Sequence, residues 1–336
     1  MTDAFAKIES AERPATAHYV PLPVGTRLPI ARYRFAFRMQ DDLRLPEYAG
    51  SLLRGQFGAA LRRTACLTGA PTCKGCPLIS TCPYPEIFET PPPTEHRLQR
   101  FSQVPNPYVI EPPVFGTRGV RAGECLSFGM VLVGRALGRF ALIVHAFQRA
   151  LGHGLGRERA RGVLEGLAVQ NGEDWIEIWD SGRGRIEAHE ALLATPDLSL
   201  VATATLRIET PLRLQHQGHP LPIEKLSPRA LLTNLMRRAT LLLELHNGNP
   251  PLLSETAAKA LAHHAETLED ERRLRWQDWS RYSSRQKQEM TLGGAIGEWT
   301  LKGDLAPVAP LLWLGQWLHA GKNATMGMGG YTLGLN

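Results

Sequence analysis

The order of the predicted elements repeats along the chain, and this repetition limits the possible folds more than any other feature. In the first half, residues 31–39 alternate apolar and polar side chains, as expected for a half-buried strand. Residues 46–65 follow with apolar side chains at helical spacing. Further strands at 124–133 and 163–169 enclose a helix at 136–151. This half therefore has the order β-α-(β)-β-α-β.

The second half shows a similar order. Its predicted elements are strands at 201–214 and 330–335, helices at 228–246, 257–273 and 306–319, and a hairpin at 290–301. We therefore predict an α+β fold with two tandem ferredoxin-like domains, each of the pattern βαββαβ. The domains should cover residues 1–196 and 197–336, which agrees with the length expected for two domains.

A Gly-rich loop stands at the same place in each half, after an apolar helix and before the final strand. The loops are residues 151–162 and 319–330. Glycines let backbone N–H groups approach an anion closely, and Lys322 adds a positive charge to the second loop. The order helix–loop–strand excludes a phosphate-binding P-loop. The loops are interpreted as RNA contacts, with a tight turn as the alternative; the expected contact residues are His153, Arg157, Gly321, Gly327 and Gly329.

Four of the five cysteines form a cluster with the spacing C-x6-C-x2-C-x5-C. They are Cys66, Cys73, Cys76 and Cys82. The two-residue gap between Cys73 and Cys76 lets two thiolates bind one metal ion. The sequence shows no secretory signal, so structural disulfides are not expected. We predict a structural zinc site in an insertion at 66–90 of the first domain, with an iron–sulfur cluster or reduced thiols as alternatives. Cys125 lies apart in a strand-like segment and is expected to be a core thiol.

The chain is basic and rich in arginine. Its formal net charge is +6, and 31 of its 38 basic residues are arginines. Arginine contacts phosphates through a planar bidentate group, so this composition favours a nucleic-acid partner. At 272–287, six cations are interleaved with Trp276, Trp279 and Tyr282, a combination that can bind phosphates and stack on bases; a solvated face is the alternative. Both tryptophans are expected to pack inward, and the candidates for RNA contact are Arg281, Tyr282, Ser283, Arg285 and Lys287.

Two cellular settings are excluded by the sequence. No stretch of about 18 uninterrupted apolar residues is present, which excludes a membrane span. Residues 1–10 carry charges and lack an apolar core, so they do not form a secretory signal. We therefore expect a cytoplasmic protein with no membrane partner.

Several segments resemble one known family. Residues 52–61, the cysteine cluster and residues 84–88 resemble the N-terminal part of the RAMP superfamily of CRISPR-associated proteins. Four segments of the second half resemble the C-terminal domain of the CRISPR repeat-processing endoribonucleases, the Cas-six family: 210–214, 281–286, 293–297 and 319–331. The resemblance spans nearly the whole chain. Its most specific part is the closing segment, with helix, Gly-rich loop and strand in the expected order.

This resemblance implies an RNA-processing activity. Such enzymes bind the repeat of a CRISPR precursor transcript (pre-crRNA) and cut it once per repeat without a catalytic metal. The ribose 2′-OH attacks the adjacent phosphate and leaves a 2′,3′-cyclic phosphate and a 5′-OH. A general base, often His, accepts the 2′-OH proton, Lys or Arg stabilises the phosphate charge, and Tyr or Ser positions it. The implied partners are repeat RNA and subunits of a CRISPR effector complex.

The candidate catalytic residues follow from these roles. Relatives commonly carry a catalytic His near the first helix, but residues 46–65 contain none and offer arginines instead. His319, beside the Gly-rich loop, is therefore the leading candidate for the base. The predicted catalytic set is His319, Lys322, Tyr282 and Arg54, and Arg62 joins the RNA-binding set. Because the first helix lacks a His, a second hypothesis is a non-catalytic RNA-binding RAMP subunit. A third hypothesis is a zinc-dependent nucleic-acid-binding module unrelated to CRISPR.

Overall fold

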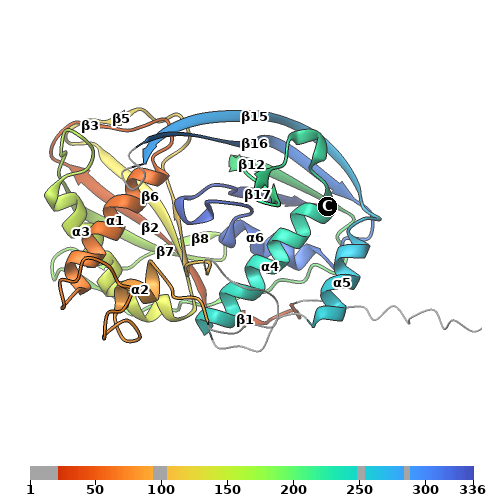
Figure 1. The fold of residues 1–336 in the computed structure, drawn as a ribbon, viewed down its shortest axis with the longest axis horizontal. Helices are drawn as coiled ribbons and strands as arrows, with labels where there is room; N and C mark the ends of the chain where they lie inside the picture. Colours follow the sequence, from red (N-terminus) through yellow and green to blue (C-terminus); the bar gives the residue numbers. More distant parts are fainter. Residues whose placement is uncertain (1–21, 94–103, 248–253, 284–287) are drawn as a thin grey trace, which may run out of the picture.

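Two large β-sheets lie side by side in the computed structural model, and each packs against its own helices (Figure 1). The structure describes residues 22–93, 104–247, 254–283 and 288–336. The strands of the first sheet come from the first half of the chain, and those of the second sheet come from the second half.

The first sheet has five strands, and every neighbouring pair is antiparallel. In sheet order they are β4 (Tyr108–Glu111), β6 (Cys125–Val133), β2 (Ile30–Met39), β7 (Gly162–Asn171) and β8 (Asp174–Glu177). The alternating sequence of β2 explains its central place, because every odd-numbered side chain from Ala31 to Met39 is buried.

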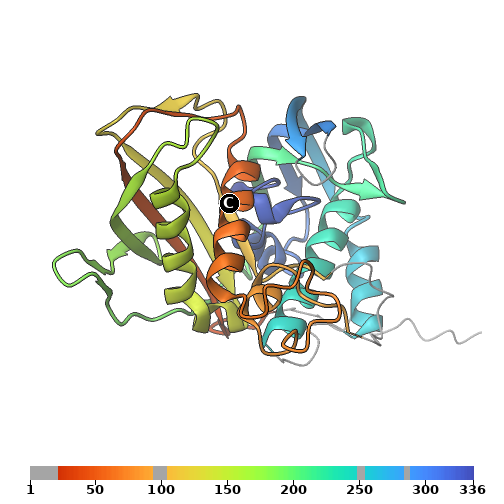
Figure 2. The ribbon, with the colours of Figure 1, turned by 60° about the vertical axis from the view of Figure 1, so that its left-hand side comes forward.

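Two helices cover one face of this sheet. These are α1 (Gly50–Ala65) and α3 (Phe140–His153), which lie against each other in Figure 2. Phe57 of α1 and Phe147 of α3 stack with their ring centroids 4.8 Å apart, and Phe35 of β2 lies 5.1 Å from Phe147. The core of the first half is thus a sheet-on-helix layer built around these aromatic rings.

The second sheet has four antiparallel strands in the order β15 (Glu269–Ser283), β16 (Gln288–Lys302), β12 (Thr203–Leu212) and β17 (Tyr331–Leu335). Its core also takes up α4 (Pro228–Asn247), α5 (Glu255–His264) and α6 (Ala309–Leu318). Counted in chain order, and leaving out β8, the four strands of each half have the same spatial order, 2-3-1-4.

The two halves share one core at their boundary. Val109, Val131 and Val133 of the first sheet belong to the apolar cluster of the second half, together with residues of α4 and α6. The face of the first sheet that α1 and α3 leave open is therefore partly covered by the second half. The remaining short elements are β1 (Arg27–Leu28), β3 (Leu43–Arg44), α2 (Pro83–Ile87), β5 (Gly119–Val120), η1 (Gly134–Arg139), β9 (Trp179–Asp180), β10 (Arg185–Ile186), β11 (Leu193–Ala194), β13 (Gln215–His216), β14 (His219–Pro220), η2 (Ile223–Lys225) and η3 (Ala324–Met326).

The hairpin of β15 and β16 corrects two predictions. The predicted hairpin at 290–301 is wrong, because this segment is one continuous strand, and the predicted helix at 257–273 ends at His264. Fifteen registered pairs join β15 to β16, so the basic segment lies on a strand. The hairpin extends over the first half in Figure 1, and there Trp279 packs on Tyr48 with ring centroids 4.7 Å apart.

Three smaller expectations also differ from the structure. Trp279 is buried, but Trp276 is half-buried and donates from its indole nitrogen to Asp278, because side chains three apart on a strand point to opposite faces. Cys125 begins β6 on the open face of the sheet and is exposed, so it is not a core thiol. Strand β4 was not predicted, since it lies within a Pro-rich tract. Within the described residues, no helix is long and apolar enough to cross a membrane.

Candidate nucleic-acid interface

The second Gly-rich loop connects α6 to β17 and contains the candidates His319 and Lys322. Positive φ angles begin at His319 (58°) and recur at Gly321 (83°) and Gly329 (71°). A Cβ on Gly329 would stand 1.8 Å from the carbonyl oxygen of Ala320, so only glycine fits there. The sequence therefore builds a tightly folded loop rather than an open one.

The loop docks on the first half of the chain. The Tyr48 hydroxyl donates to the Met326 carbonyl at 2.8 Å, and a Cβ on Gly50 would stand 1.9 Å from the same oxygen. Thr210 of β12 donates to the Gly327 carbonyl and accepts from the Gly330 N–H. The start of α1 and the end of β12 thus hold the loop from two sides.

A buried polar triad lies under the loop. Glu111, the last residue of β4, places one carboxylate oxygen 3.1 Å from Nε of Arg32 and 3.3 Å from Nε2 of His319. The other imidazole nitrogen, Nδ1, lies 3.0 Å from the Gly327 carbonyl oxygen. Arg32 also donates to the Gln316 carbonyl on α6. The triad therefore joins the first sheet to the segment that carries the loop.

The protonation of this triad follows from its partners. Burial alone would raise the pKa of Glu111, but Arg32 and His319 outweigh it and hold that pKa below its ordinary value. A carbonyl only accepts, so Nδ1 of His319 carries a proton and donates to Gly327. Nε2 of His319 faces the Glu111 carboxylate, so each imidazole nitrogen has one partner.

The consequence for His319 is specific. Its side chain is only 5% exposed, and both of its nitrogens are engaged, Nδ1 with the Gly327 carbonyl and Nε2 with Glu111. A general base needs a free nitrogen lone pair. As placed here, His319 holds the loop, and a base role requires that the contact with Glu111 opens.

Lys322 lies on the rim of the same loop and is exposed. Its backbone N–H donates to the Arg213 carbonyl at 2.9 Å, and the neighbouring Gly321 N–H donates to Oδ1 of Asn234 at 2.7 Å. The Arg213 guanidinium donates to the Gly293 carbonyl at 2.8 Å, and burial lowers the pKa of Arg213 although Asp278 opposes this. Arg213 and Asn234 were not predicted; Arg213 falls within the segment 210–214 that carried the resemblance.

An open groove of about 480 Å³ runs along the uncovered face of the first sheet. It begins beside Glu111 and passes Arg34, whose guanidinium lies 4.5 Å from the ring centroid of Trp175. The groove thus combines a cation with a half-buried aromatic ring next to the polar triad. Neither residue was singled out from the sequence.

Four of the other predicted residues lie elsewhere. The Arg54 guanidinium lies over the Phe88 ring at 4.4 Å, and Arg62 donates to the Ala70 and Pro71 carbonyls, so both are engaged within the first half. His153, at the end of α3, is exposed and its Nδ1 donates to the Arg149 carbonyl, and Arg157 is exposed in the first Gly-rich loop. Two candidates, Arg285 and Lys287, fall outside the described residues. For Arg281, Tyr282 and Ser283 the structure describes the backbone but not the side chains.

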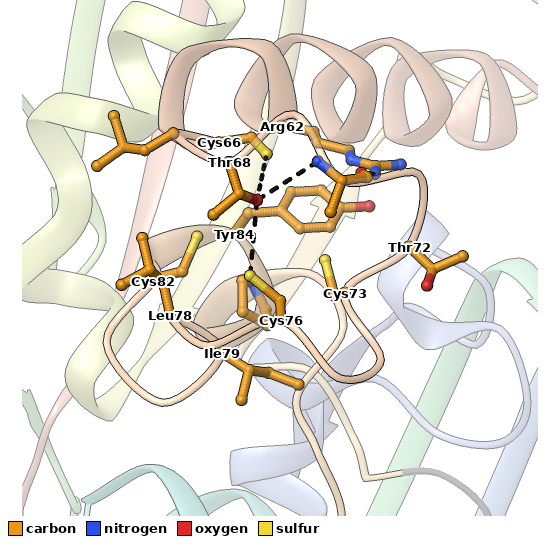
Figure 3. A pocket seen from close by; sticks show the side chains of 13 residues that line it. Arg62, Cys66, Thr68, Thr72, Cys73, Cys76, Leu78, Ile79, Cys82 and Tyr84 are labelled. Atoms are coloured by element: carbon orange, nitrogen blue, oxygen red, sulfur yellow. Dashed lines mark hydrogen bonds between the residues drawn. The ribbon is translucent and has the colours of Figure 1, made fainter.

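The four clustered cysteines line one small pocket between α1 and α2 (Figure 3). All four are free thiols and half-buried. Within the described residues, no three His, Cys, Asp or Glu side chains already stand in metal-binding positions. The structure thus brings the predicted ligands to one place without showing a formed site.

Comparisons with known proteins agree with this architecture. Residues 206–331 match the family model of the CRISPR-associated endoribonuclease Cas6, and residues 28–191 match the model of an N-terminal domain, AF_1859_N. No curated protein matches the sequence.

Solved structures resemble the chain over most of its length. A Cas6 product complex shares 18% identity at a TM-score of 0.55 and covers 90% of this chain and 99% of its own. Thermus thermophilus Cas6 shares 16% identity at a TM-score of 0.50, over 92% of this chain and 99% of its own.

A further match is a partial Cas6-RT-Cas1–Cas2 complex, with 14% identity and a TM-score of 0.54. There the match covers 94% of this chain but only 47% of the other. At such identities the likeness concerns the fold, which is a mixed α+β fold similar to that of solved Cas6 structures. The resemblance stated from the sequence is therefore confirmed: residues 206–331 match the model of the CRISPR-associated endoribonuclease Cas6, and the fold is similar to that of solved Cas6 structures.

Proposed function

We propose that this protein processes CRISPR precursor transcripts by cutting each repeat once, through attack of a ribose 2′-OH on the adjacent phosphate. The products are a 2′,3′-cyclic phosphate and a 5′-OH, and no metal takes part in the reaction. The observation that carries the proposal is the loop 319–330, which lies within the segment that matches the Cas6 model. Its exposed Lys322 stands beside the Arg213 and Asn234 contacts described above.

We further propose that the two sheets are tandem ferredoxin-like RAMP domains. The common strand order 2-3-1-4, with a helix after the first and third strands of each half, supports this assignment. In this arrangement RNA lies along the junction of the domains, between the rim at Lys322 and the groove at Arg34 and Trp175. The cation and the ring offer a phosphate contact and a stacking surface to single-stranded RNA.

In the proposed reaction, Lys322 stabilises the charge that develops on the scissile phosphate. Once RNA binding has opened the contact with Glu111, Nε2 of His319, unprotonated and released to solvent, accepts the 2′-OH proton. Two variants separate this base role from a holding role. A His319→Gln variant that binds repeat RNA normally but cuts at least about 100-fold more slowly supports the base. An equal loss of binding and cutting assigns His319 to positioning alone.

A second function, a non-catalytic RNA-binding subunit, is favoured by one observation. Both nitrogens of His319 are engaged, and α1 carries no histidine. Such a subunit would bind repeat RNA within a CRISPR assembly and leave the cut to another protein. A cutting assay distinguishes the two functions.

The decisive experiment incubates the purified protein with repeat RNA in excess EDTA. We expect one cut per repeat, a 2′,3′-cyclic phosphate end, and no cut when the scissile ribose is 2′-deoxy. Lys322→Ala should slow cutting by about 100-fold, the usual loss for one charge-stabilising group. Lys302→Ala is the control, because Lys302 is equally exposed but ends β16 in an ion pair with Glu271. Tight RNA binding without any cut would refute the enzymatic proposal and favour the binding subunit.

A further inference from the structure

We propose that Cys66, Cys73, Cys76 and Cys82 bind one zinc ion as four thiolates, and that this ion fixes the insertion to the start of α2 and the end of α1. The site is separate from the RNA interface and takes no part in the cut. It is a structural metal site within the first half of the chain.

The positions of the cysteines support a shared ion. Cys66 caps the C-terminus of α1, Cys82 caps the N-terminus of α2, and Cys73 and Cys76 lie on the turn between them. All four line the same pocket, and in Figure 3 their sulfur atoms surround one central space. The enclosed space is about 20 Å³, which is room for one ion or one water molecule.

The hydroxyl of Thr68 separates two of the thiols in the structure. It lies 3.8 Å from Sγ of Cys66 and 3.6 Å from Sγ of Cys76, so it stands between the two sulfur atoms (Figure 3). In a tetrahedral zinc site with bonds of about 2.3 Å, neighbouring sulfur atoms lie about 3.8 Å apart. Binding therefore requires the exposed Thr68 side chain to leave and the thiols to close on the ion.

The insertion has few other means of holding its shape. Its backbone hydrogen bonds between Cys73 and Cys82 are short turns, and Leu67 is 86% exposed. Only Cys73 and Cys82 of the four pack against the core of the first half. A segment of this length with so little buried apolar surface is typical of loops that a metal ion organises.

Arg62 provides the charge that a four-thiolate site needs nearby. Zinc with four thiolates carries a net charge of −2, which a neighbouring cation stabilises. Arg62 lines the same pocket, and its guanidinium donates to the Ala70 and Pro71 carbonyls of the insertion at 2.6 and 2.8 Å. The residue predicted to contact RNA is thus placed to support the metal site instead.

Metal analysis of the purified full-length protein tests the proposal. We expect one equivalent of zinc in the wild type and in Cys125→Ser, and none in Cys76→Ser. Cys125 is the matched control because it is the fifth cysteine, exposed on β6 and outside the insertion. The proposal is overturned if the wild type holds no zinc, if it holds iron with visible absorption, or if both variants lose zinc equally.

A second measurement covers the case in which Cys76→Ser does not fold. Wild-type protein stripped of metal is titrated with Co²⁺, which replaces zinc and absorbs in the visible range when four thiolates surround it. We expect that spectrum to saturate at one equivalent and to disappear when zinc is added. A spectrum without visible absorption refutes the zinc site. RNA cutting in EDTA is a separate assay, and its result decides only the proposed reaction.

Discussion

Replacing Glu111 with alanine tests whether the buried triad joins the two halves of the protein. The Glu111 carboxylate is 23% exposed and pairs with Arg32 and His319, whose side chains are 18% and 5% exposed. Removing one partner of a buried ion pair costs about 3–5 kcal/mol, because it leaves the other charge unpaired. Arg32 keeps Gln170 and the Gln316 carbonyl, so we expect the lower end, about 3 kcal/mol.

Thermal and urea unfolding at neutral pH measure this loss. For 336 residues the unfolding entropy is about 0.7 kcal/mol/K, so a cost of about 3 kcal/mol should lower Tm by about 4 °C. Glu165→Ala is the matched control, because Glu165 forms an ion pair with Arg38 in which both side chains are about half exposed. Such exposed pairs contribute little, so the control should unfold close to the wild type. If Glu111→Ala and Glu165→Ala unfold together, the triad does not join the halves.

The pH dependence gives a further check on Glu111. Its pKa is held below the ordinary value in the folded protein, so the unfolded chain takes up a proton first as the pH falls. The stabilisation by Glu111 is therefore complete above its ordinary pKa of about 4.3 and is lost as the pH falls through the lower folded value. The difference between wild type and Glu111→Ala should stay constant from pH 5 to 8 and shrink in stronger acid. A difference that disappears already at pH 6 would contradict this assignment.

Two further substitutions have expected outcomes. Gly50→Ala places a Cβ 1.9 Å from the Met326 carbonyl oxygen and should destabilise the protein by about 1–3 kcal/mol. Gly55→Ala on the same helix meets nothing within 4 Å and should stabilise the protein by about 0.8 kcal/mol. Chemical unfolding that ranks the two variants otherwise would refute the packing argument. Burial lowers the pKa of His246 to about 4, so stability should fall as the pH drops below the unfolded value of about 6.5, by about 2 kcal/mol at pH 5. His246→Gln, which can still donate to the Pro105 carbonyl, should unfold with a flatter pH profile between 7 and 5, and an unchanged profile would count against the assignment.

The sequence predicted the elements whose side chains alternate or repeat over a buried core. The strand at 31–39 and the helix at 228–246 were found almost at their predicted bounds, because each buries one regular face. The segment 269–283 was misread, because much of this strand extends beyond the sheet core and its polar residues occupy both faces. Its two tryptophans, three residues apart, were expected to pack inward together, which a strand does not allow.

The candidate site was only partly accessible to such reasoning. The Gly-rich loop, His319 and Lys322 were visible as a local pattern in the sequence. Glu111 and Arg32, which engage His319 and α6, come from strands far away in the chain, and nothing local marks them as partners. The metal site remains a proposal, and the structure places its four cysteines at one pocket.

The shared core at the domain boundary has a consequence for how the protein is made. Val109, Val131 and Val133 face a partner that the ribosome delivers only with the second half of the chain. During synthesis, the first sheet can form early but presents an uncovered apolar strip until α4 and α6 arrive. The nascent first half is therefore the stage at which this protein is most exposed to aggregation, and release from that stage depends on residues made more than a hundred positions later.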